Sequence, residues 1–355
     1  MLLTLWFACV LGSADEAAVT VEVRPGAAAL VASGQEQLLS VDFVLTSQSS
    51  EELTVGAIEL SVLDRAGKLQ LRSTVNSDGE RPSIDVLGTH RLRPGEPELI
   101  MNPFQRLDGA LDASELRFEF KLYGKEQVSH ATVTLHPRRT TPTAVRLPVE
   151  GRLWVFDGDD FYSHHRRFDF VSPTARQLGF RSNVLRHAVD LVLLDAEGAT
   201  HHGDPDRNES WFGFGRPVLA AAPGTVVAAV DSRPDSRRLD LALLKSDRMA
   251  MFGNHAVVKL DSGEFALYAH LRQGSLRCKV GERVREGQQL GSIGASGGSA
   301  MPHLHFELQT SSDADGEGQP VRFKGFRRIL GSRAVAVRSG IVETGQILEA
   351  APASR

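Results

Sequence analysis

Short β-strands are the dominant pattern of the first 136 residues. In the run ELRFEFKLYG, which begins at Glu115, apolar side chains alternate with charged ones, as in a strand that buries one face. The runs AIELSVLDRAGKL from Ala57 and HATVTLHP from His130 repeat this alternation. Because several such strands follow one another without a long helical pattern, we predict an immunoglobulin-like β-sandwich over residues 19–136.

The rest of the chain is again strand-rich. The segment PRRTTPTA, residues 137–144, is polar and flanked by prolines, which is typical of a linker. Beyond it, a hairpin is expected at residues 256–270 and a helix or loop near residues 236–251. The pattern predicts a linker, a second β-rich domain and a carboxy-terminal extension, at residues 137–149, 150–335 and 336–355.

The start of the chain has the pattern of a secretory leader. An apolar run from Leu2 to Leu11 precedes small residues, so residues 1–14 are predicted to be a signal peptide and the protein to be exported to the periplasm, the cell envelope or the medium. Cys9 could be lipid-modified, although its aromatic neighbours fit such a site poorly. Later segments fall short of the eighteen or so apolar residues of a membrane-spanning helix, so no transmembrane segment is expected.

The composition and net charge of the chain indicate which kinds of binding partner to expect. The chain has 355 residues, 41% of them hydrophobic and 24% charged, with a net charge of −4, as in a globular protein of about two domains. Because a long Lys/Arg block is missing, nucleic acid is not expected as a partner. Cys278, which would be left alone by removal of the leader, is predicted to be a small buried apolar residue.

The candidate chemistry lies in the run MPHLHFEL, residues 301–308. Side chains alternate faces along a strand, so His303 and His305 should project from the same side. Two imidazoles in one space suggest a metal or a proton relay, although such pairs also occur on solvated strands. Asp190, in LRHAVDLVLLD, lies among apolar residues, where a buried carboxylate needs a partner such as a metal.

The surrounding motifs resemble the lysostaphin-type (LytM-like) zinc endopeptidases. The hairpin ends in Tyr-Ala-His-Leu and is followed by Val-Gly-x-x-Val-x-x-Gly-Gln, a Gly/Ser loop and Pro-His-Leu-His-Phe, in the order of that family. The run RPVLAAAPGTVVAAV from Arg216 is similar to the strand-turn-strand before this hairpin. The resemblance covers about residues 150–330 and implies a β-rich peptidase domain that binds one zinc ion per chain.

The resemblance also implies roles for individual residues. In such enzymes zinc is held by a His, an Asp and the second His of the His-x-His pair, which makes Asp190 and His305 metal ligands. His270 and His303 would flank the water and the substrate carbonyl without binding the metal. Three protein ligands leave zinc a position for a water molecule, and nearby imidazoles can orient that water and stabilise an oxyanion.

The first histidine ligand is open between two segments. The common motif places it four residues before the Asp, but His187 precedes Asp190 by three, which puts the two on opposite faces of a regular strand. The upstream run SHHRR offers His165. The runs HHRR and RHAVD resemble a branch of these peptidases in which a His-Arg-Arg stretch precedes an Arg-aromatic-Ala-Ile-Asp segment. We therefore prefer His165 over His187, with His164 as a third choice. Only a bulge or an irregular turn would bring His187 beside Asp190.

The leading functional prediction is a zinc-dependent endopeptidase of the cell envelope that cleaves peptide bonds in peptidoglycan stems or cross-bridges. The alternative is a catalytically silent LytM-like domain that binds and activates another cell-wall hydrolase. Such domains typically lose ligands or the flanking histidines, whereas this chain has candidates for all five positions. An enzyme that acts on a protein outside the wall is a third possibility.

Overall fold

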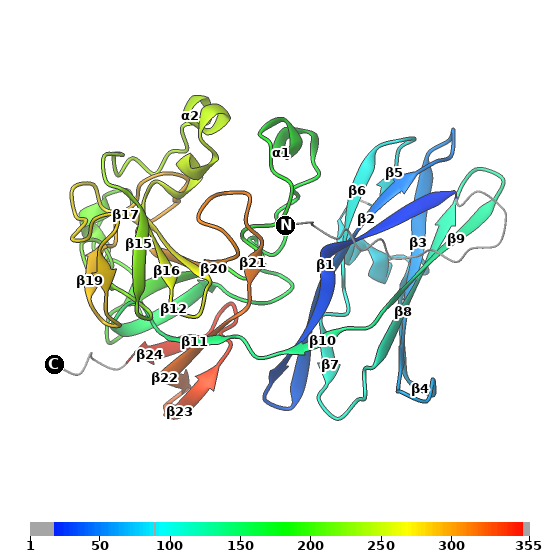
Figure 1. Cartoon of the computed structure of the whole chain (residues 1–355), viewed down its shortest axis with the longest axis horizontal. Helices are drawn as coiled ribbons and strands as arrows, with labels where there is room; N and C mark the ends of the chain where they lie inside the picture. Colours follow the sequence, from blue (N-terminus) through cyan, green and yellow to red (C-terminus); the bar gives the residue numbers. More distant parts are fainter. Residues whose placement is uncertain (1–17, 89, 351–355) are drawn as a thin grey trace. The chain divides into compact units, whose positions relative to one another are not determined.

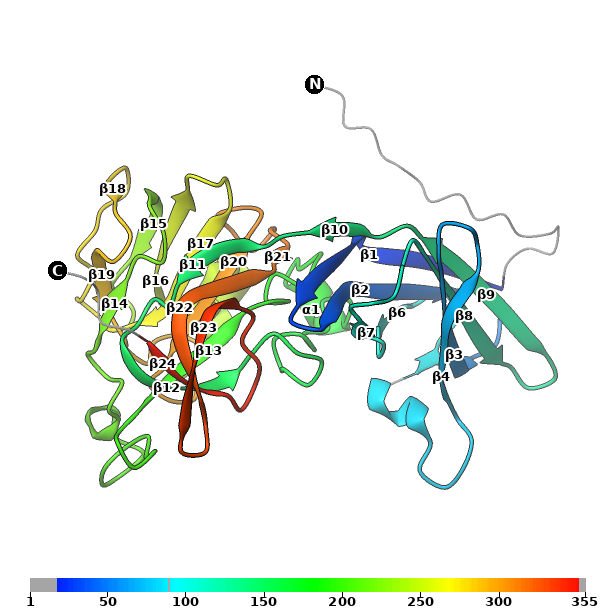
Figure 2. The same ribbon diagram turned by 90° about the horizontal axis from the view of Figure 1, so that it is seen from below.

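The chain forms two compact units that divide between Thr140 and Thr141 in the computed structural model. The structure describes residues 18–88 and 90–350, so the predicted signal peptide lies outside the described residues. Both units are mostly β, as predicted (Figures 1 and 2). In the part of the chain that is described, the helices are too short or too polar to cross a membrane.

The first unit contains two five-stranded sheets among its described residues. One has the order β10-β1-β2-β6, with β7 also paired to β2, and the other has the order β4-β3-β8-β9, with β5 paired to β3. The elements are β1 Val19–Ser33, β2 Glu36–Ser47, β3 Leu53–Leu63, β4 Leu69–Asn76, η1 Ser83–Leu87, β5 Arg91–Leu92, β6 Pro97–Met101, β7 Arg106–Asp108, β8 Glu115–Tyr123, β9 Val128–Leu135 and β10 Arg138–Thr140.

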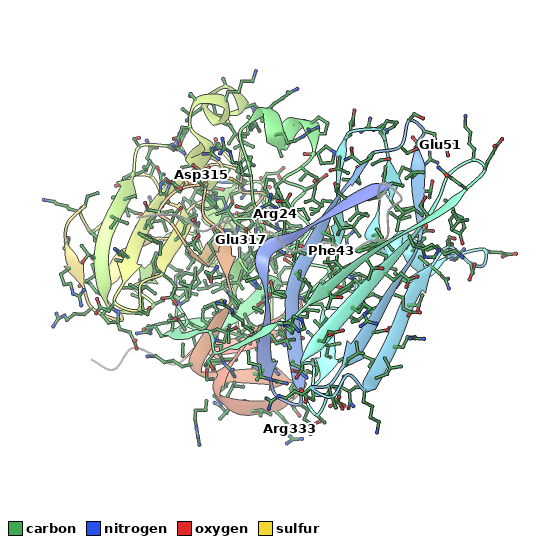
Figure 3. All side chains as sticks on the ribbon, turned by 45° about the vertical axis from the view of Figure 1, so that its right-hand side comes forward. Arg24, Phe43, Glu51, Asp315, Glu317 and Arg333 are labelled. Carbon is green, nitrogen blue, oxygen red and sulfur yellow. The ribbon has the colours of Figure 1, made fainter. Side chains whose placement is uncertain are left out.

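The two sheets of this unit share one apolar core. Phe43 of β2, labelled in Figure 3, lies with its ring centroid 4.7 Å from that of Phe118 and 5.1 Å from that of Phe120, both on β8. In β8 buried apolar residues alternate with more exposed charged ones, which confirms the predicted strand. The unit is therefore a β-sandwich, and its immunoglobulin-like type stays a prediction.

The second unit is built on a long mixed sheet. Its described strands follow the order β11-β22-β24-β12-β13-β20-β17-β16-β15-β18, with β21 on β20 and β23 on β22, and β14 pairs with β19 separately. The elements are β11 Thr143–Arg146, β12 Gly151–Asp157, α1 Pro173–Gln177, β13 Val189–Leu194, η2 Asn208–Ser210, β14 Pro217–Leu219, β15 Gly224–Val230, α2 Leu241–Ser246, η3 Arg248–Phe252, β16 Asn254–Leu260, β17 Phe265–Leu271, β18 Arg283–Val284, β19 Gln289–Ser292, β20 Leu304–Gln309, β21 Gly318–Gln319, β22 Val321–Leu330, β23 Arg333–Gly340 and β24 Ile347–Ala350.

Apolar packing on one face of this sheet leaves the other face for polar groups. Val189 and Leu191 of β13 and Leu304 and Phe306 of β20 are fully buried in the main core. The residues between them in the sequence therefore point to the opposite face. The predicted hairpin is confirmed, since β16 and β17 pair in antiparallel fashion, and Cys278 is buried as predicted.

The predicted linker and extension both contain strands. β10 and β11 lie within the linker range and pair with β1 and β22, respectively. β23 and β24 lie largely within the range predicted as an extension, and both pair with β22. These segments thus contribute hydrogen-bonded strands to the two units.

Candidate metal centre

Four neighbouring strands bring the candidate residues into one row across the sheet. His305 of β20 is the register partner of Asp190 on β13 and of Ala269 on β17. On the far side of β13, Asp190 is paired with Asp157 of β12. Residues directly opposite on paired strands point to the same face, so this row places two carboxylates and an imidazole side by side.

A β-bulge puts Asp157 on this face. Val155 pairs with Leu191, and the next pair is Asp157 with Asp190, so Phe156 is the extra residue of β12. Without the bulge, Asp157 would point to the same face as the core residue Val155. A one-residue shift moves a side chain to the other face of a sheet, which is how the bulge carries Asp157 beside Asp190.

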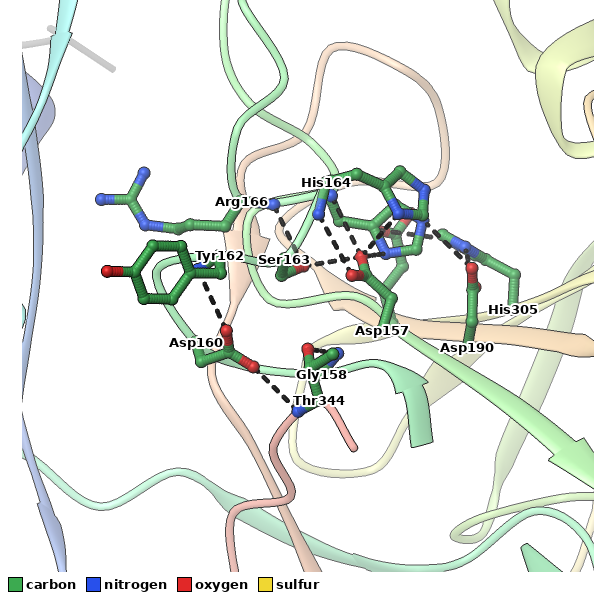
Figure 4. Close-up of polar contacts among 12 residues, drawn as sticks. Asp157, Gly158, Asp160, Tyr162, Ser163, His164, Arg166, Asp190, His305 and Thr344 are labelled. Carbon is green, nitrogen blue, oxygen red and sulfur yellow. Dashed lines mark hydrogen bonds and ion pairs between the residues drawn. The ribbon is translucent and has the colours of Figure 1, made fainter. Parts of the chain in front are cut away.

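Three side chains of this region direct ligand atoms at one another. Nδ1 of His305 lies 3.1 Å from Oδ1 of Asp190 (Figure 4). Nε2 of His165 lies 3.7 Å from Oδ2 of the same carboxylate. All three residues are buried, with exposed fractions of 2% for His305, 3% for Asp190 and 5% for His165. His165 comes from the long connection between β12 and β13, whereas the other two lie on strands.

The spacing of these atoms fits a zinc ion. Zinc bound tetrahedrally, about 2.0–2.1 Å from nitrogen and oxygen ligands, keeps those ligand atoms about 3.3–3.4 Å apart. The separations of 3.1 and 3.7 Å, each measured to a different oxygen of Asp190, lie near that value, and one ligand atom from each of the three residues lies within 4.8 Å of the others. Two imidazoles and one carboxylate are also a donor set that zinc accepts in catalytic sites. The residues present therefore fit this metal, and each contributes one ligand atom.

Each candidate histidine ligand has a second carboxylate behind it. Nδ1 of His165 lies 2.8 Å from Oδ2 of Asp157, and Nε2 of His305 lies 3.7 Å from Oε2 of Glu307. Glu307 is fully buried and also accepts a hydrogen bond from the side-chain amide of Gln309. A carboxylate behind a histidine ligand is typical of metal sites, because it fixes the orientation of the ring.

Two further imidazoles stand beside this group. The ring centroid of His270 lies 4.8 Å from that of His303 and 5.7 Å from that of His305. Nε2 of His303 lies 3.3 Å from Oδ1 of Asp190. The prediction that His303 and His305 face one space is thus confirmed, since both rings contact the same carboxylate.

His270 reaches this position through a second bulge. Asn254 pairs with Leu271 and Ala256 with Tyr268, so Ala269 and His270 together oppose one residue of β16. His270 has a φ of 58°, a left-handed conformation that few residues other than glycine adopt. On a regular strand His270 would point to the face opposite Ala269, away from the site. The bulge turns its side chain toward the site.

Backbone carbonyls determine which ring nitrogen of each flanking histidine carries a proton. Nδ1 of His270 lies 2.8 Å from the carbonyl oxygen of Ser296, and Nδ1 of His303 lies 2.7 Å from that of Met301. A carbonyl only accepts hydrogen bonds, so both Nδ1 atoms must donate. In each neutral ring Nε2 is then the nitrogen that can take a proton.

Burial and neighbouring charges together lower the pKa values of His270 and Asp190 and raise that of His305. Burial, together with the neighbouring His303 and His305, holds the pKa of His270 well below its ordinary value. Burial opposes the charged forms of Asp190 and His305 as well, but for Asp190 the charges of His165 and His303 and the hydrogen bonds of His303 and His305 prevail. The pKa of Asp190 is held well below its usual range, and hydrogen bonds and charge from Asp190 and Glu307 raise the pKa of His305 to about 10.

The two other candidates for the first ligand, His187 and His164, are not part of the His165–Asp190–His305 group. Nδ1 of His187 lies 2.9 Å from Oδ1 of Asp159, in a buried pair of its own. His187 precedes β13, so strand alternation does not govern its direction. His164 is largely exposed and stacks on His165, with ring centroids 4.0 Å apart.

Sequence reasoning missed Asp157, Glu307 and Ser296. Glu307 carried a signal, because it lies two residues after His305 and so shares its strand face. Asp157 ends a run in which Leu153 and Val155 are the buried positions, and simple alternation would have assigned it to the core. Ser296 acts through its backbone carbonyl, for which side-chain identity gives no signal.

A buried group of two histidines and an aspartate, flanked by two more imidazoles, is a site of the kind that metal-dependent hydrolases use. Residues 212–322 match the family model for peptidase family M23. This part of the chain is a peptidase M23 domain, and the predicted resemblance is confirmed. The matched residues include His270, His303 and His305, whereas His165 and Asp190 precede them.

Three proteins illustrate the relatives of this chain. The cell division protein DipM of Caulobacter vibrioides is 34% identical over 107 residues, which are 30% of this chain and 15% of DipM. The murein hydrolase activator EnvC of Escherichia coli is 32% identical over 104 residues, 29% of this chain and 22% of EnvC. The peptidoglycan DD-endopeptidase ShyC of Vibrio cholerae is 32% identical over 90 residues, 25% of this chain and 20% of ShyC. The chain thus matches less than a quarter of each relative.

Proposed function

We propose that this protein is a zinc-dependent endopeptidase that cleaves peptide bonds in peptidoglycan stems or cross-bridges. The observation that carries the proposal is the buried His165–Asp190–His305 group, whose ligand atoms lie within 4.8 Å of one another and form a donor set that zinc accepts. Peptidoglycan as the substrate is supported by similarity to the DD-endopeptidase ShyC. Since peptidoglycan lies outside the cytoplasm, the proposal requires export to the periplasm, the envelope or the medium.

Residues of the site would have two roles, binding the metal and transferring protons. Zinc, when bound, supplies a water of lowered pKa and polarises the scissile carbonyl. His165, Asp190 and His305 hold the ion. His270 and His303 each keep Nδ1 on a backbone carbonyl, so Nε2 is the nitrogen through which each ring would act. An Nε2 that accepts a proton from the attacking water can then donate a hydrogen bond to the developing oxyanion. In this structure Nε2 of His303 lies 3.3 Å from Oδ1 of Asp190.

A second function is supported by the similarity to the murein hydrolase activator EnvC. A silent domain that activates another hydrolase needs the M23 fold as a binding surface and has no use for a metal group. The complete set of five candidate residues in this chain favours the enzyme.

Digestion of purified peptidoglycan separates the two functions. The zinc-loaded protein should release soluble peptide-linked fragments and expose new amino termini, and the His303→Ala variant should release far fewer. If the zinc-loaded protein releases none, yet increases the release by a purified amidase, the activator function would replace the enzymatic one.

A further inference from the structure

We infer that Asp157 is the positioning residue of the metal site, seating the loop that carries His165 and turning Nε2 of that ring toward Asp190. The inference rests on the proposed function, because it assigns a role toward the zinc ion proposed there. It goes beyond that function in assigning the role to a residue that lies outside the M23 match and contacts the metal only through His165.

The Asp157 carboxylate accepts three hydrogen bonds from this loop. Oδ2 of Asp157 accepts hydrogen bonds from the hydroxyl of Ser163, at 2.6 Å, and from the backbone N–H of His165, at 3.1 Å. Oδ1 accepts one from the backbone N–H of His164, also at 3.1 Å (Figure 4). Two consecutive peptide groups and the preceding side chain are thereby fixed to the end of β12. Because β12 is itself paired with β13, the loop is positioned relative to Asp190.

The same carboxylate fixes the His165 ring. Nδ1 of His165 contacts Oδ2 of Asp157 at 2.8 Å, although the two atoms are not aligned for a hydrogen bond. With Nδ1 on that side of the ring, Nε2 is the nitrogen that faces Asp190, at 3.7 Å. The imidazole thus bridges two carboxylates that the bulge at Phe156 has placed side by side.

A second metal ion bound by Asp157, His164 and His165 is the competing interpretation, since these three also cluster. Two features argue against it. The Asp157 carboxylate already accepts hydrogen bonds from Ser163 and from two backbone N–H groups, besides its contacts with Nδ1 of His164 at 3.1 Å and Nδ1 of His165 at 2.8 Å. His165 would also have to bind one metal through each ring nitrogen, and a neutral imidazole keeps a proton on one of them.

The chain contains a matched control for this role. Asp159 is buried to nearly the same degree as Asp157, with exposed fractions of 3% and 4%, and lies 2.9 Å from Nδ1 of His187. The two Asp–His pairs are thus alike in burial and in the distance between Nδ1 and the carboxylate, and their aspartates are two residues apart. They differ in that His165, and not His187, belongs to the His–Asp–His group.

The test compares Asp157→Asn with Asp159→Asn in the full chain. Removal of a carboxylate behind a metal-binding histidine typically weakens metal affinity about 10- to 100-fold. Competition with a zinc chelator should show this loss for Asp157→Asn and less than about a threefold change for Asp159→Asn. The absorption spectrum of the cobalt-substituted protein should change for Asp157→Asn alone, and unfolding of the metal-free proteins reports any general loss of stability.

Three outcomes would overturn the inference. Wild-type zinc affinity in folded Asp157→Asn would show that the residue does not position the ligand. Binding of two zinc ions by the wild type, with loss of one in Asp157→Asn, would favour the second metal site. If Asp157→Asn does not fold, nitrogen-15 spectra of the zinc-loaded wild type still decide, because metal on Nδ1 of His165 would contradict the assignment.

If the proposed zinc-dependent function is wrong, the same experiments give a result different from the one that refutes only the role of Asp157. In that case the wild type itself binds no zinc with useful affinity, and His305→Ala changes nothing. A wild type that binds zinc, and loses it on His305→Ala but not on Asp157→Asn, retains the proposed function and refutes only the role of Asp157.

Discussion

The metal site has a regular half and an irregular half. Asp190 and His305 are register partners on two adjacent strands, where pairing alone places their side chains together. Asp157 and His270 reach the site only because β-bulges redirect them, and His165 comes from a loop. The comparison shows that strand pairing places two of the proposed ligands, while local irregularities place His165 and the flanking imidazole of His270.

Removal of a ligand from the regular half should have the largest effect. The His305→Ala protein has lost an imidazole from a site with three protein ligands, and two ligands rarely hold zinc as three do. We expect zinc content to fall from about one equivalent per chain to about a tenth or less, by elemental analysis after reconstitution. Equal zinc in His305→Ala and wild type would remove the metallopeptidase proposal.

Replacement of histidines in the irregular half tests which imidazole completes the site. His165→Ala should lose zinc almost as completely as His305→Ala, because Nε2 of His165 is the third ligand atom. His187→Phe should keep most of the metal, since that ring pairs with Asp159 instead. Chelator competition on both proteins gives the comparison. Loss of zinc in His187→Phe, with His165→Ala unaffected, would reverse the assignment.

Replacement of the flanking imidazoles should lower turnover much more than zinc content. Removal of one group that stabilises an oxyanion costs about 10²- to 10³-fold in kcat. His270→Ala and His303→Ala should each show a loss of that order on a peptide substrate while retaining about one zinc per chain. Zinc content and kcat measured on the same preparation check this. Loss of the metal from His270→Ala would place His270 among the ligands.

The smallest expected effect is the release of a proton when zinc binds. The pKa of His305 is raised to about 10, so the metal-free protein carries a proton there at neutral pH, whereas a metal ligand must be neutral. Asp190, whose pKa is lowered, is already ionised and releases no proton. Zinc binding near pH 7 should therefore release about one proton from His305, and affinity should rise with pH until that pKa. Calorimetry in two buffers of different ionisation enthalpy measures this release, and a heat independent of buffer would contradict it.

The two halves also differ in how far the sequence predicts them. Alternation along 301–308 placed His303 and His305 on one side, and the apolar neighbours of Asp190 indicated a buried strand. Both predictions use only the period of a regular strand. The hairpin that carries His270 was predicted as well, but the bulge that turns its ring was not, because the extra residue depends on the pairing with β16.

The loop that carries His165 was the hardest part to predict. Spacing indicated that His187 fits a shared strand face poorly, and the resemblance of the HHRR run favoured His165, but neither gave the His165 ring a position. That position depends on Asp157, whose side-chain direction is set by a one-residue bulge and not by its own run of residues. The strands of the sandwich, by contrast, follow directly from alternation, as in β8.

The location of the metal in the zinc-loaded full-length protein tests the central claim most directly. Anomalous diffraction at the zinc edge should place a single ion bound by Nε2 of His165, a carboxylate oxygen of Asp190 and Nδ1 of His305. Zinc bound instead between His187 and Asp159, or between His164 and Asp157, would contradict the proposed site.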